Sequence, residues 1–173
     1  MRQDVLKKLK EKSNKYVPTE AHIVELDYNT QTDKKVLSEL YKNWTDAEFI
    51  PMITNSTTSP TRKIFAITTQ NSAYDNLNTD EILGIADISL KDSHVHTRFL
   101  QANPNIINQT DRETKGLGRS LMQGIMSYFK ELGFEDMKVF VRQSEKPFYR
   151  KIFPNIEDKF STADDSSNMI LKL

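Results

Sequence analysis

Four of the five glycines in this chain fall within eighteen residues, where their spacing suits phosphate binding. They are Gly116, Gly118, Gly124 and Gly133, and the first two stand directly before a segment with the apolar spacing of a helix. Glycine lets the backbone approach a ligand closely. The first amide groups of a helix have no partner inside it and lie at the positive end of its dipole. The spacing therefore predicts a phosphate or pyrophosphate site, with a tight structural turn as the alternative.

Two common nucleotide-binding motifs are absent from the sequence. No string of the form G-x-x-x-x-G-K-S/T occurs, so a P-loop is disfavoured. A Rossmann fingerprint needs a third glycine three residues after the second, but Leu121 occupies that position and the next glycine is Gly124. The phosphate is therefore expected to belong to a ligand of another kind of fold.

Four features together resemble the GNAT superfamily of N-acetyltransferases. They are the order of the elements, the strand exit Ala102-Asn-Pro104, the helix start Gly116-x-Gly118 and the string Lys146-Pro-Phe-Tyr-Arg-Lys-Ile-Phe153. The resemblance is clearest from about residue 81 to the C-terminus. The chain departs from the family pattern at Glu113, where Arg or Gln is usual, at Phe153-Pro154, and in a longer loop from Pro104 to Gly116.

The resemblance implies a function and a cofactor. A primary amine would attack the thioester of acetyl-CoA directly, with a strand amide near Leu100 stabilising the oxyanion and no metal involved. The pantetheine arm is expected along a strand end, at Leu100, Gln101 and Ala102. The pyrophosphate is expected on the amides of Thr114, Lys115, Gly116, Leu117, Gly118, Arg119 and Ser120, and Tyr149 is expected to contact the cofactor as well.

Two side chains are the candidates for proton transfer. Tyr149 matches the tyrosine that protonates the departing thiolate in this family, and the alternative is a tyrosine of the core. The amine must also lose a proton to a base near the strands. His94, His96 and Arg98 share one face of an expected strand by alternation, and the ordinary pKa of a histidine lies in the useful range. His96 is therefore the candidate base, with a surface histidine of no catalytic role as the alternative.

Apolar patterns indicate the elements that position these residues. A helix is expected over 117–132, with Leu117, Leu121, Met122, Ile125, Phe129 and Leu132 on its buried face and Gly133 at its end. The other elements are a strand at 21–27, a helix capped by Thr32 or Asp33, a helical piece at 45–53, strands at 64–67, 82–90, 94–102 and 137–141, a short helix at 145–152 and a closing hairpin. This order, β-α-α-β-β-β-α-β-α-β-β, predicts a single mixed α/β domain of GNAT type. Its central sheet is expected to be mixed, mostly antiparallel and flanked by helices.

The first sixteen residues are rich in positive charge. Residues 1–16 carry six basic side chains against Asp4 and Glu11, and Val5, Leu6 and Leu9 form a short apolar stripe. This segment is expected to be a basic arm, for RNA or an anionic surface, or a solvated terminal helix. Residues 17–173 are expected to form the acetyltransferase domain.

Composition excludes several classes of protein. Lys and Arg total 24, as do Asp and Glu, so no excess positive charge favours nucleic acid. The chain has no cysteine, and its three histidines lack the spacing of a helical zinc pair. No apolar run approaches the roughly 18 residues of a membrane span, and the N-terminus lacks the apolar core of a signal peptide. A cytoplasmic protein without a metal or a membrane partner is therefore expected.

The acceptor of the acetyl group stays open at this point. A small-molecule amine and a peptide amine are both compatible with the sequence, and an aminoacyl or RNA acceptor is not excluded. The alternative to an enzyme is a GNAT-like domain that binds an acyl-CoA as a sensor or interaction module without turnover. A homodimer is an expectation from the family resemblance alone.

Overall fold

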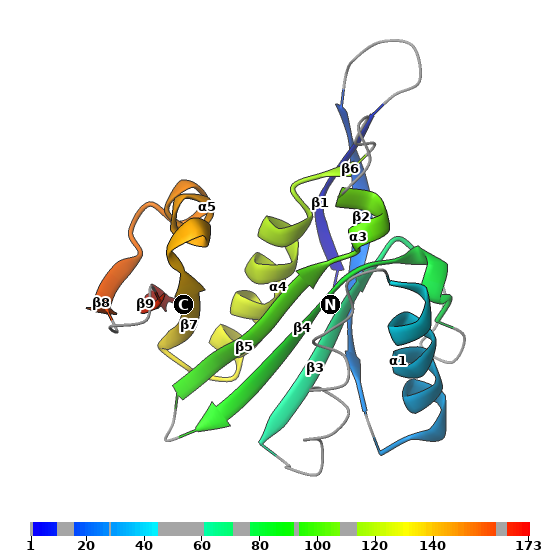
Figure 1. The fold of residues 1–173 in the computed structure, drawn as a ribbon, viewed down its shortest axis with the longest axis horizontal. Helices are drawn as coiled ribbons and strands as arrows, with labels where there is room; N and C mark the ends of the chain where they lie inside the picture. Colours follow the sequence, from blue (N-terminus) through cyan, green and yellow to red (C-terminus); the bar gives the residue numbers. More distant parts are fainter. Residues whose placement is uncertain are drawn as a thin grey trace.

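A nine-stranded sheet runs through the described part of the chain. The structure is a computed structural model that describes residues 2–9, 16–27, 29–44, 61–70, 77–91, 94–107, 114–161 and 166–173. The strands are β1 (Arg2–Leu9), β2 (Tyr16–Leu26), β3 (Arg62–Thr68), β4 (Ile82–Lys91), β5 (His94–Ala102), β6 (Thr114–Lys115), β7 (Asp136–Arg142), β8 (Glu157–Ser161) and β9 (Ser166–Lys172). They lie in the order β6-β1-β2-β3-β4-β5-β7-β9-β8 (Figure 1). Among these described neighbours only β5 and β7 run parallel, so the expected mixed, mostly antiparallel sheet is confirmed.

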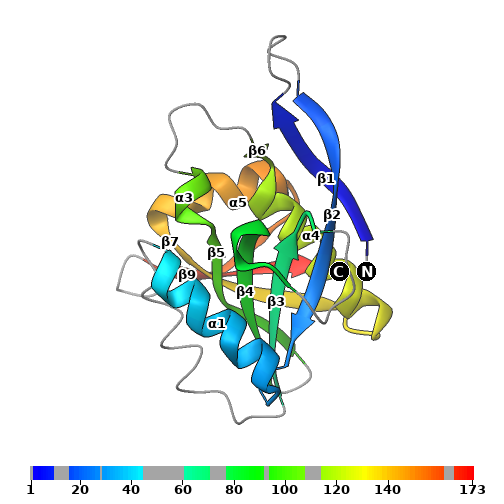
Figure 2. The ribbon, with the colours of Figure 1, turned by 90° about the vertical axis from the view of Figure 1, so that its right-hand side faces the viewer.

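Two helices cover opposite faces of this sheet (Figure 2). Helix α1 (Gln31–Asn43) buries Val36, Leu37 and Leu40 against residues of β3 and β4. Helix α4 (Leu117–Glu131) buries its apolar side in a separate and larger cluster on the other face. Each face of the sheet is therefore apolar and packs against its own helix, which gives the layered arrangement of a mixed α/β domain.

Helix α4 confirms the helix predicted from the apolar spacing. Its buried residues include Leu117, Leu121, Met122, Ile125 and Phe129. Leu132, expected on the same buried face, is 53% exposed. The reason is that the helix ends at Glu131 and Gly133 turns the chain with a φ of +87°, a conformation that favours glycine.

Helix α1 begins earlier than predicted. Its N-cap is Thr30, whose hydroxyl accepts a hydrogen bond from the amide of Asp33 at 3.2 Å. The Asp33 side chain, predicted as a possible cap, is buried and instead accepts from the amide of Asp27 at 2.6 Å. Asp33 therefore ties the first turn of α1 to the end of β2.

The alternative prediction of a terminal helix in residues 1–16 is wrong, because Arg2–Leu9 forms the strand β1. This strand pairs with β2 from Arg2↔His22 to Leu9↔Tyr16, and β6 pairs with its other edge. A bare edge of β2 would expose unpaired backbone groups, which pairing with β1 satisfies. The same pairing extends the first predicted strand back to Tyr16.

Short elements complete the described chain. They are η2 (Thr79–Glu81), α3 (Pro104–Ile107), η3 (Gln143–Glu145) and α5 (Lys146–Ile152). The strands predicted at 64–67 and 82–90 are confirmed by β3 and β4, which pair with each other, and the closing hairpin is confirmed by β8 and β9. The helical piece predicted at 45–53 lies outside the described residues.

Candidate active site

Strands β5 and β7 begin side by side and then separate. Their parallel register runs from Val95↔Met137 to Thr97↔Val139. Beyond these pairs β5 continues to Ala102 and β7 to Arg142, and the two described strands make no further pair. From Arg98 onward, β7 therefore does not cover the edge of β5 that faces it. An extended ligand can bind such an edge through backbone hydrogen bonds, as an added strand does.

A bulge in β5 lies at the point of separation. Asp87 of β4 pairs with Phe99, whereas the next residue, Ile88, pairs with Thr97. Arg98 is therefore the extra residue of a β-bulge, which re-aims the side chains around it. After the bulge, Leu100 and Ala102 pack against the apolar cluster that α4 buries on its face of the sheet (the α4 core). Phe99 packs against the apolar cluster under α1 on the opposite face (the α1 core).

A buried ion pair holds the sheet beside this bulge. Asp87 is fully buried, and the Nε of Arg62 donates to its Oδ1 at 2.8 Å while Nη2 of the same arginine donates to Oδ2. The Nε of Arg98 lies 3.7 Å from Asp87 Oδ2, beyond hydrogen-bond distance. Both oxygens of Asp87 are engaged by Arg62, so this carboxylate anchors the bulge and is not placed to accept a proton from a substrate.

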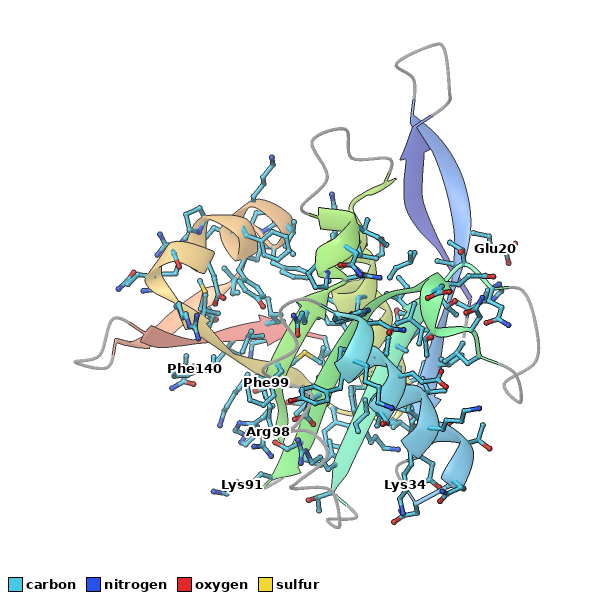
Figure 3. The ribbon with its side chains drawn as sticks, turned by 45° about the vertical axis from the view of Figure 1, so that its right-hand side comes forward. Glu20, Lys34, Lys91, Arg98, Phe99 and Phe140 are labelled. Atoms are coloured by element: carbon cyan, nitrogen blue, oxygen red, sulfur yellow. The ribbon has the colours of Figure 1, made fainter. Side chains whose placement is uncertain are left out.

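The separation of the strands leaves a cavity of about 150 Å³. Its lining comes from four elements: Thr97, Arg98, Phe99 and Leu100 of β5, Phe140 and Arg142 of β7, Glu145 of η3 and Tyr149 of α5. Figure 3 labels three of these side chains, Arg98, Phe99 and Phe140, on the two separating strands. The cavity therefore brings Tyr149 together with Leu100, two residues predicted for the site from distant parts of the sequence.

Tyr149 is the buried acid of this cavity. Only 6% of the residue is exposed. Burial raises the pKa of the Tyr149 phenol above its ordinary value, and the negative charge of Glu145 raises it further. The phenol is therefore protonated at neutral pH and can donate a hydrogen bond into the cavity.

The predicted phosphate site lies at the first turn of α4. Gly116 caps the helix with a φ of +82°, and its carbonyl accepts hydrogen bonds from both the amide and the hydroxyl of Ser120, each at 2.9 Å. Ser120 is thus occupied within the helix, and its hydroxyl does not face a ligand. The amides of Leu117, Gly118 and Arg119 precede that first intrahelical bond, so they are the donors that suit an anion.

The residues predicted to contact the phosphate differ in whether they can reach a ligand. Thr114 and Lys115 form β6 and pair with Lys8 and Lys7 of β1, so their backbone belongs to the sheet edge. The side chain of Leu117 is buried in the α4 core, whereas Arg119 is exposed. Among the residues predicted to contact the phosphate, Arg119 has an exposed side chain, which can therefore reach a bound anion.

Gly118 has a further structural reason to be glycine. A Cβ at this position would lie 3.0 Å from Cζ of Phe148 in α5. The Phe148 ring in turn lies 5.2 Å from the Tyr149 ring, centroid to centroid, in an edge-to-face arrangement. The predicted phosphate turn and the helix that carries Tyr149 are therefore in contact.

The structure does not bring His96 into the cavity. His96 pairs with Ser89 and Lys138 in the part of β5 before the separation, and it is absent from the lining. Its ring lies 6.4 Å from the ring of His94, whose Nδ1 is 3.0 Å from Asp136 Oδ1. The role of His96 as a base stays a prediction.

Sequence reasoning missed several residues of the lining. Phe140 and Arg142 alternate with the buried Val139 and Val141, so they project from the face of β7 opposite α4. A large apolar residue at an outward position of a strand was a signal for Phe140, which is 55% exposed. Glu145 gave no comparable signal in the sequence.

Comparison with known proteins identifies the fold. No family model and no curated protein matches the sequence. Among solved structures, the chain is similar to the ribosomal-protein-S18-alanine N-acetyltransferase from Escherichia coli, with a TM-score of 0.60, 15% identity, and coverage of 88% of this chain and 93% of that one. It is also similar to GCN5 of Tetrahymena, with a TM-score of 0.60, 13% identity, and coverage of 87% and 95%. The PaiA N-acetyltransferase from Thermoplasma acidophilum, solved in complex with coenzyme A, has a TM-score of 0.55, 15% identity, and coverage of 88% and 99%.

These similarities show that the chain has the GNAT fold. Within the described ranges, no group of three or more His, Asp or Glu side chains is arranged to hold a metal ion. None of the described helices combines the length and the apolar character that crossing a membrane needs.

Proposed function

We propose that this protein is an acetyl-CoA-dependent N-acetyltransferase that transfers an acetyl group to a primary amine. The observation that carries the proposal is the cavity between the separated strands β5 and β7, which is lined by both Leu100 and Tyr149. The cavity therefore joins an open strand edge to a buried proton donor in a fold shared with acetyltransferases. The cytoplasmic location and the homodimer remain expectations from the sequence.

The described residues fit acetyl-CoA at two separate places. The edge of β5 near Leu100 suits the amide-bearing pantetheine arm, which can hydrogen-bond as a strand does. The amides of Leu117, Gly118 and Arg119 suit the pyrophosphate. Acetyl-CoA supplies the activated acetyl group, and the remaining chemistry falls to the residues of the cavity.

The reaction consists of one bond made and one broken. The nitrogen of the acceptor amine bonds to the acetyl carbon, the carbon–sulfur bond breaks, and the sulfur leaves with the electron pair. Negative charge develops on the acetyl oxygen, and a backbone N–H of β5 near Leu100 is the donor proposed for it. Such a preorganised donor is commonly worth about 3–4 kcal/mol of the barrier.

Tyr149 assists the departure of the sulfur. The raised pKa of the phenol makes it a weaker acid than an ordinary thiol, whose pKa is about 8.5. Complete proton transfer to the sulfur is therefore uphill, and Tyr149 contributes mainly as a hydrogen-bond donor to the developing thiolate. This role differs in degree from the full protonation implied by the family resemblance.

The proton of the amine needs an acceptor. Glu145 is the carboxylate among the described residues that line the cavity, and its Oε2 accepts from the amide of Arg142 at 3.0 Å. Its position makes it the base that we favour, with His96 as the candidate from the sequence. Comparing Glu145→Gln with His96→Gln decides between them, because only the loss of the base lowers kcat/KM by tenfold or more.

A thermal-shift experiment tests the proposal before any acceptor is known. At a hundred times its dissociation constant, a ligand stabilises the folded protein by about 2.7 kcal/mol, which raises the Tm of a domain of this size by roughly 5–10 °C. We expect this rise with acetyl-CoA and with CoA but not with ATP or NAD. A rise without acetylation of any amine in a broad screen would instead favour a non-catalytic acyl-CoA sensor. No rise with either thioester or thiol would refute the proposal.

A further inference from the structure

On the face of the sheet that carries α1, the described helices leave side chains of β5 and β7 partly exposed. On β7, the residues that alternate with the buried core positions point toward this face, and Phe140 among them is 55% exposed. On β5, the bulge turns both Arg98 and Phe99 toward the same face, since Arg98 reaches Asp87 and Phe99 packs against the α1 core. The two strands therefore present an aromatic ring each to the cavity (Figure 3).

Two guanidinium groups accompany these rings. Arg98 and Arg142 both line the cavity, against one carboxylate, that of Glu145. The Arg98 side chain is 38% exposed although its Nε lies 3.7 Å from the buried Asp87. Asp87 already receives two closer donors from Arg62. Arg98 is therefore oriented by Asp87 without a hydrogen bond that would compete with a ligand.

The size and charge of the cavity limit what it accepts. A volume of about 150 Å³ accommodates roughly one benzene ring, so the cavity itself holds the apolar group of an acceptor and not the whole molecule. Among the described residues of the lining, Arg98 and Arg142 are positively charged and Glu145 is negatively charged. Arginine binds planar carboxylates through paired hydrogen bonds. An amine with a carboxylate and an apolar side chain matches all three features: the rings, the guanidinium groups and Glu145.

We infer that the acetyl acceptor is a small amine that carries a carboxylate and an apolar side chain, as an apolar α-amino acid does. Arg98 and Arg142 bind the carboxylate, and Phe99 and Phe140 contact the apolar group. Glu145 faces the amine. This inference rests on the proposed function and narrows its acceptor to one chemical class.

Three probe amines test it: phenylalanine, phenylalaninamide and phenethylamine. They share a ring and a primary amine, and only phenylalanine has the carboxylate. Acetylation is followed by CoA release, and binding is followed by calorimetry in the presence of CoA, which needs no turnover. We expect phenylalanine to exceed each of the other two at least tenfold in kcat/KM and in affinity.

Variants assign the preference to the two arginines. Arg98→Gln and Arg142→Gln should each bring the phenylalanine-to-phenethylamine ratio close to one, whereas Lys138→Gln, on the same face of β7 outside the lining, should retain it. Arg142 is exposed, so its variant is informative even where Arg98→Gln destabilises the sheet. A wild-type ratio near one, or a ratio that both arginine variants retain, overturns the inference. Equal use of phenylalaninamide overturns it as well and points to peptide amines.

The outcomes separate this inference from the proposed function. A Tm rise with acetyl-CoA, together with no binding of phenylalanine, removes the acceptor assignment and leaves the cofactor assignment standing. Calorimetric binding of phenylalanine that depends on the two arginines, without a Tm rise from acetyl-CoA, supports the acceptor site and refutes the transferase.

Discussion

Gly118 in the first turn of α4 and Phe148 in α5 are packed so closely that a Cβ on the glycine would lie 3.0 Å from Cζ of the ring. The glycine belongs to the turn predicted to hold a pyrophosphate, and Phe148 directly precedes Tyr149. The contact therefore joins the turn proposed to bind the cofactor to the helix that carries the buried Tyr149. A half-exposed ring can move aside, so this contact affects position more than stability.

Gly118→Ala should displace α5 and weaken the site. We expect a three- to tenfold loss in kcat/KM for acetyl-CoA, with the free energy of unfolding within about 1 kcal/mol of wild type, because alanine is the better helix former. Removing the ring in the double variant with Phe148→Ala should recover part of the loss. A double-mutant cycle on kcat/KM measures this coupling, and strictly additive effects would argue against the mechanical connection.

The ion pair of Arg62 and Asp87 should contribute strongly to stability. Asp87→Asn removes the negative charge of Asp87 from beside the guanidinium of Arg62, whose side chain is 4% exposed. Loss of one partner of a buried pair typically costs about 3–5 kcal/mol. We expect urea unfolding of Asp87→Asn to show a loss of this size in the free energy of unfolding. The matched control is the exposed pair Lys35 and Glu39, 3.8 Å apart along α1, where Glu39→Gln should cost no more than about 0.5 kcal/mol. Equal effects of the two variants would show that Asp87 does not anchor the bulge.

Tyr149→Phe should separate catalysis from cofactor binding. The variant keeps the ring and loses the hydrogen bond to the departing sulfur, so kcat should fall at least tenfold. The Tm rise with acetyl-CoA should persist, because the donors assigned to the pyrophosphate are backbone amides of α4. An unchanged kcat would remove Tyr149 from the mechanism.

The raised pKa of Tyr149 predicts a loss of stability at alkaline pH. Between the ordinary tyrosine pKa of about 10 and the higher folded value, the folded chain holds a proton that the unfolded chain has released. The free energy of unfolding therefore has its full Tyr149 contribution below about pH 10 and declines above it, by at most about 1.4 kcal/mol per pH unit. Unfolding measured between pH 8 and 11 should show a shallower decline for Tyr149→Phe than for wild type. Equal slopes for the two proteins would contradict the prediction.

Lys63 adds to the same decline and must be separated from it. Burial alone would lower the pKa of Lys63, but the hydrogen bond and charge of Glu25, 2.6 Å away, together with those of Tyr128, outweigh burial and raise it. A raised lysine pKa also stabilises the folded chain below its ordinary value of about 10.4 and ceases to do so as the pH rises. The Tyr149 effect is therefore taken as the difference between the wild-type and Tyr149→Phe slopes, in which the Lys63 contribution cancels.

Local patterns predicted much of the fold. Helix α4 follows from the spacing of Leu121, Ile125 and Phe129, and Gly133 marks its end because few other residues adopt its backbone conformation. The mixed sheet follows from strand alternation and the order of elements. Strand β1 did not follow, because the spacing of Val5, Leu6 and Leu9 suits a short helix, and only pairing with the distant β2 decides for a strand.

The sequence predicted those parts of the candidate site that depend on local features and missed those that depend on how distant strands pair. The phosphate turn is visible in sequence because glycine and a helix start are local features. The bulge at Arg98 is not, since it depends on how β5 registers with β4 at Asp87 and Ile88. Simple alternation through β5 would place Leu100 on the face of His96, whereas the bulge turns Leu100 toward the α4 core. The lining by Phe140 and Arg142 likewise depends on where β5 and β7 separate.

Amide hydrogen exchange with and without acetyl-CoA tests the central claim most directly. The proposed cofactor site consists of the β5 edge at Arg98–Ala102 and the first turn of α4 at Leu117–Arg119. We predict that acetyl-CoA slows exchange in both segments, and that CoA does the same, while ATP and NAD do not. Unchanged exchange in both segments at saturating acetyl-CoA would contradict the account.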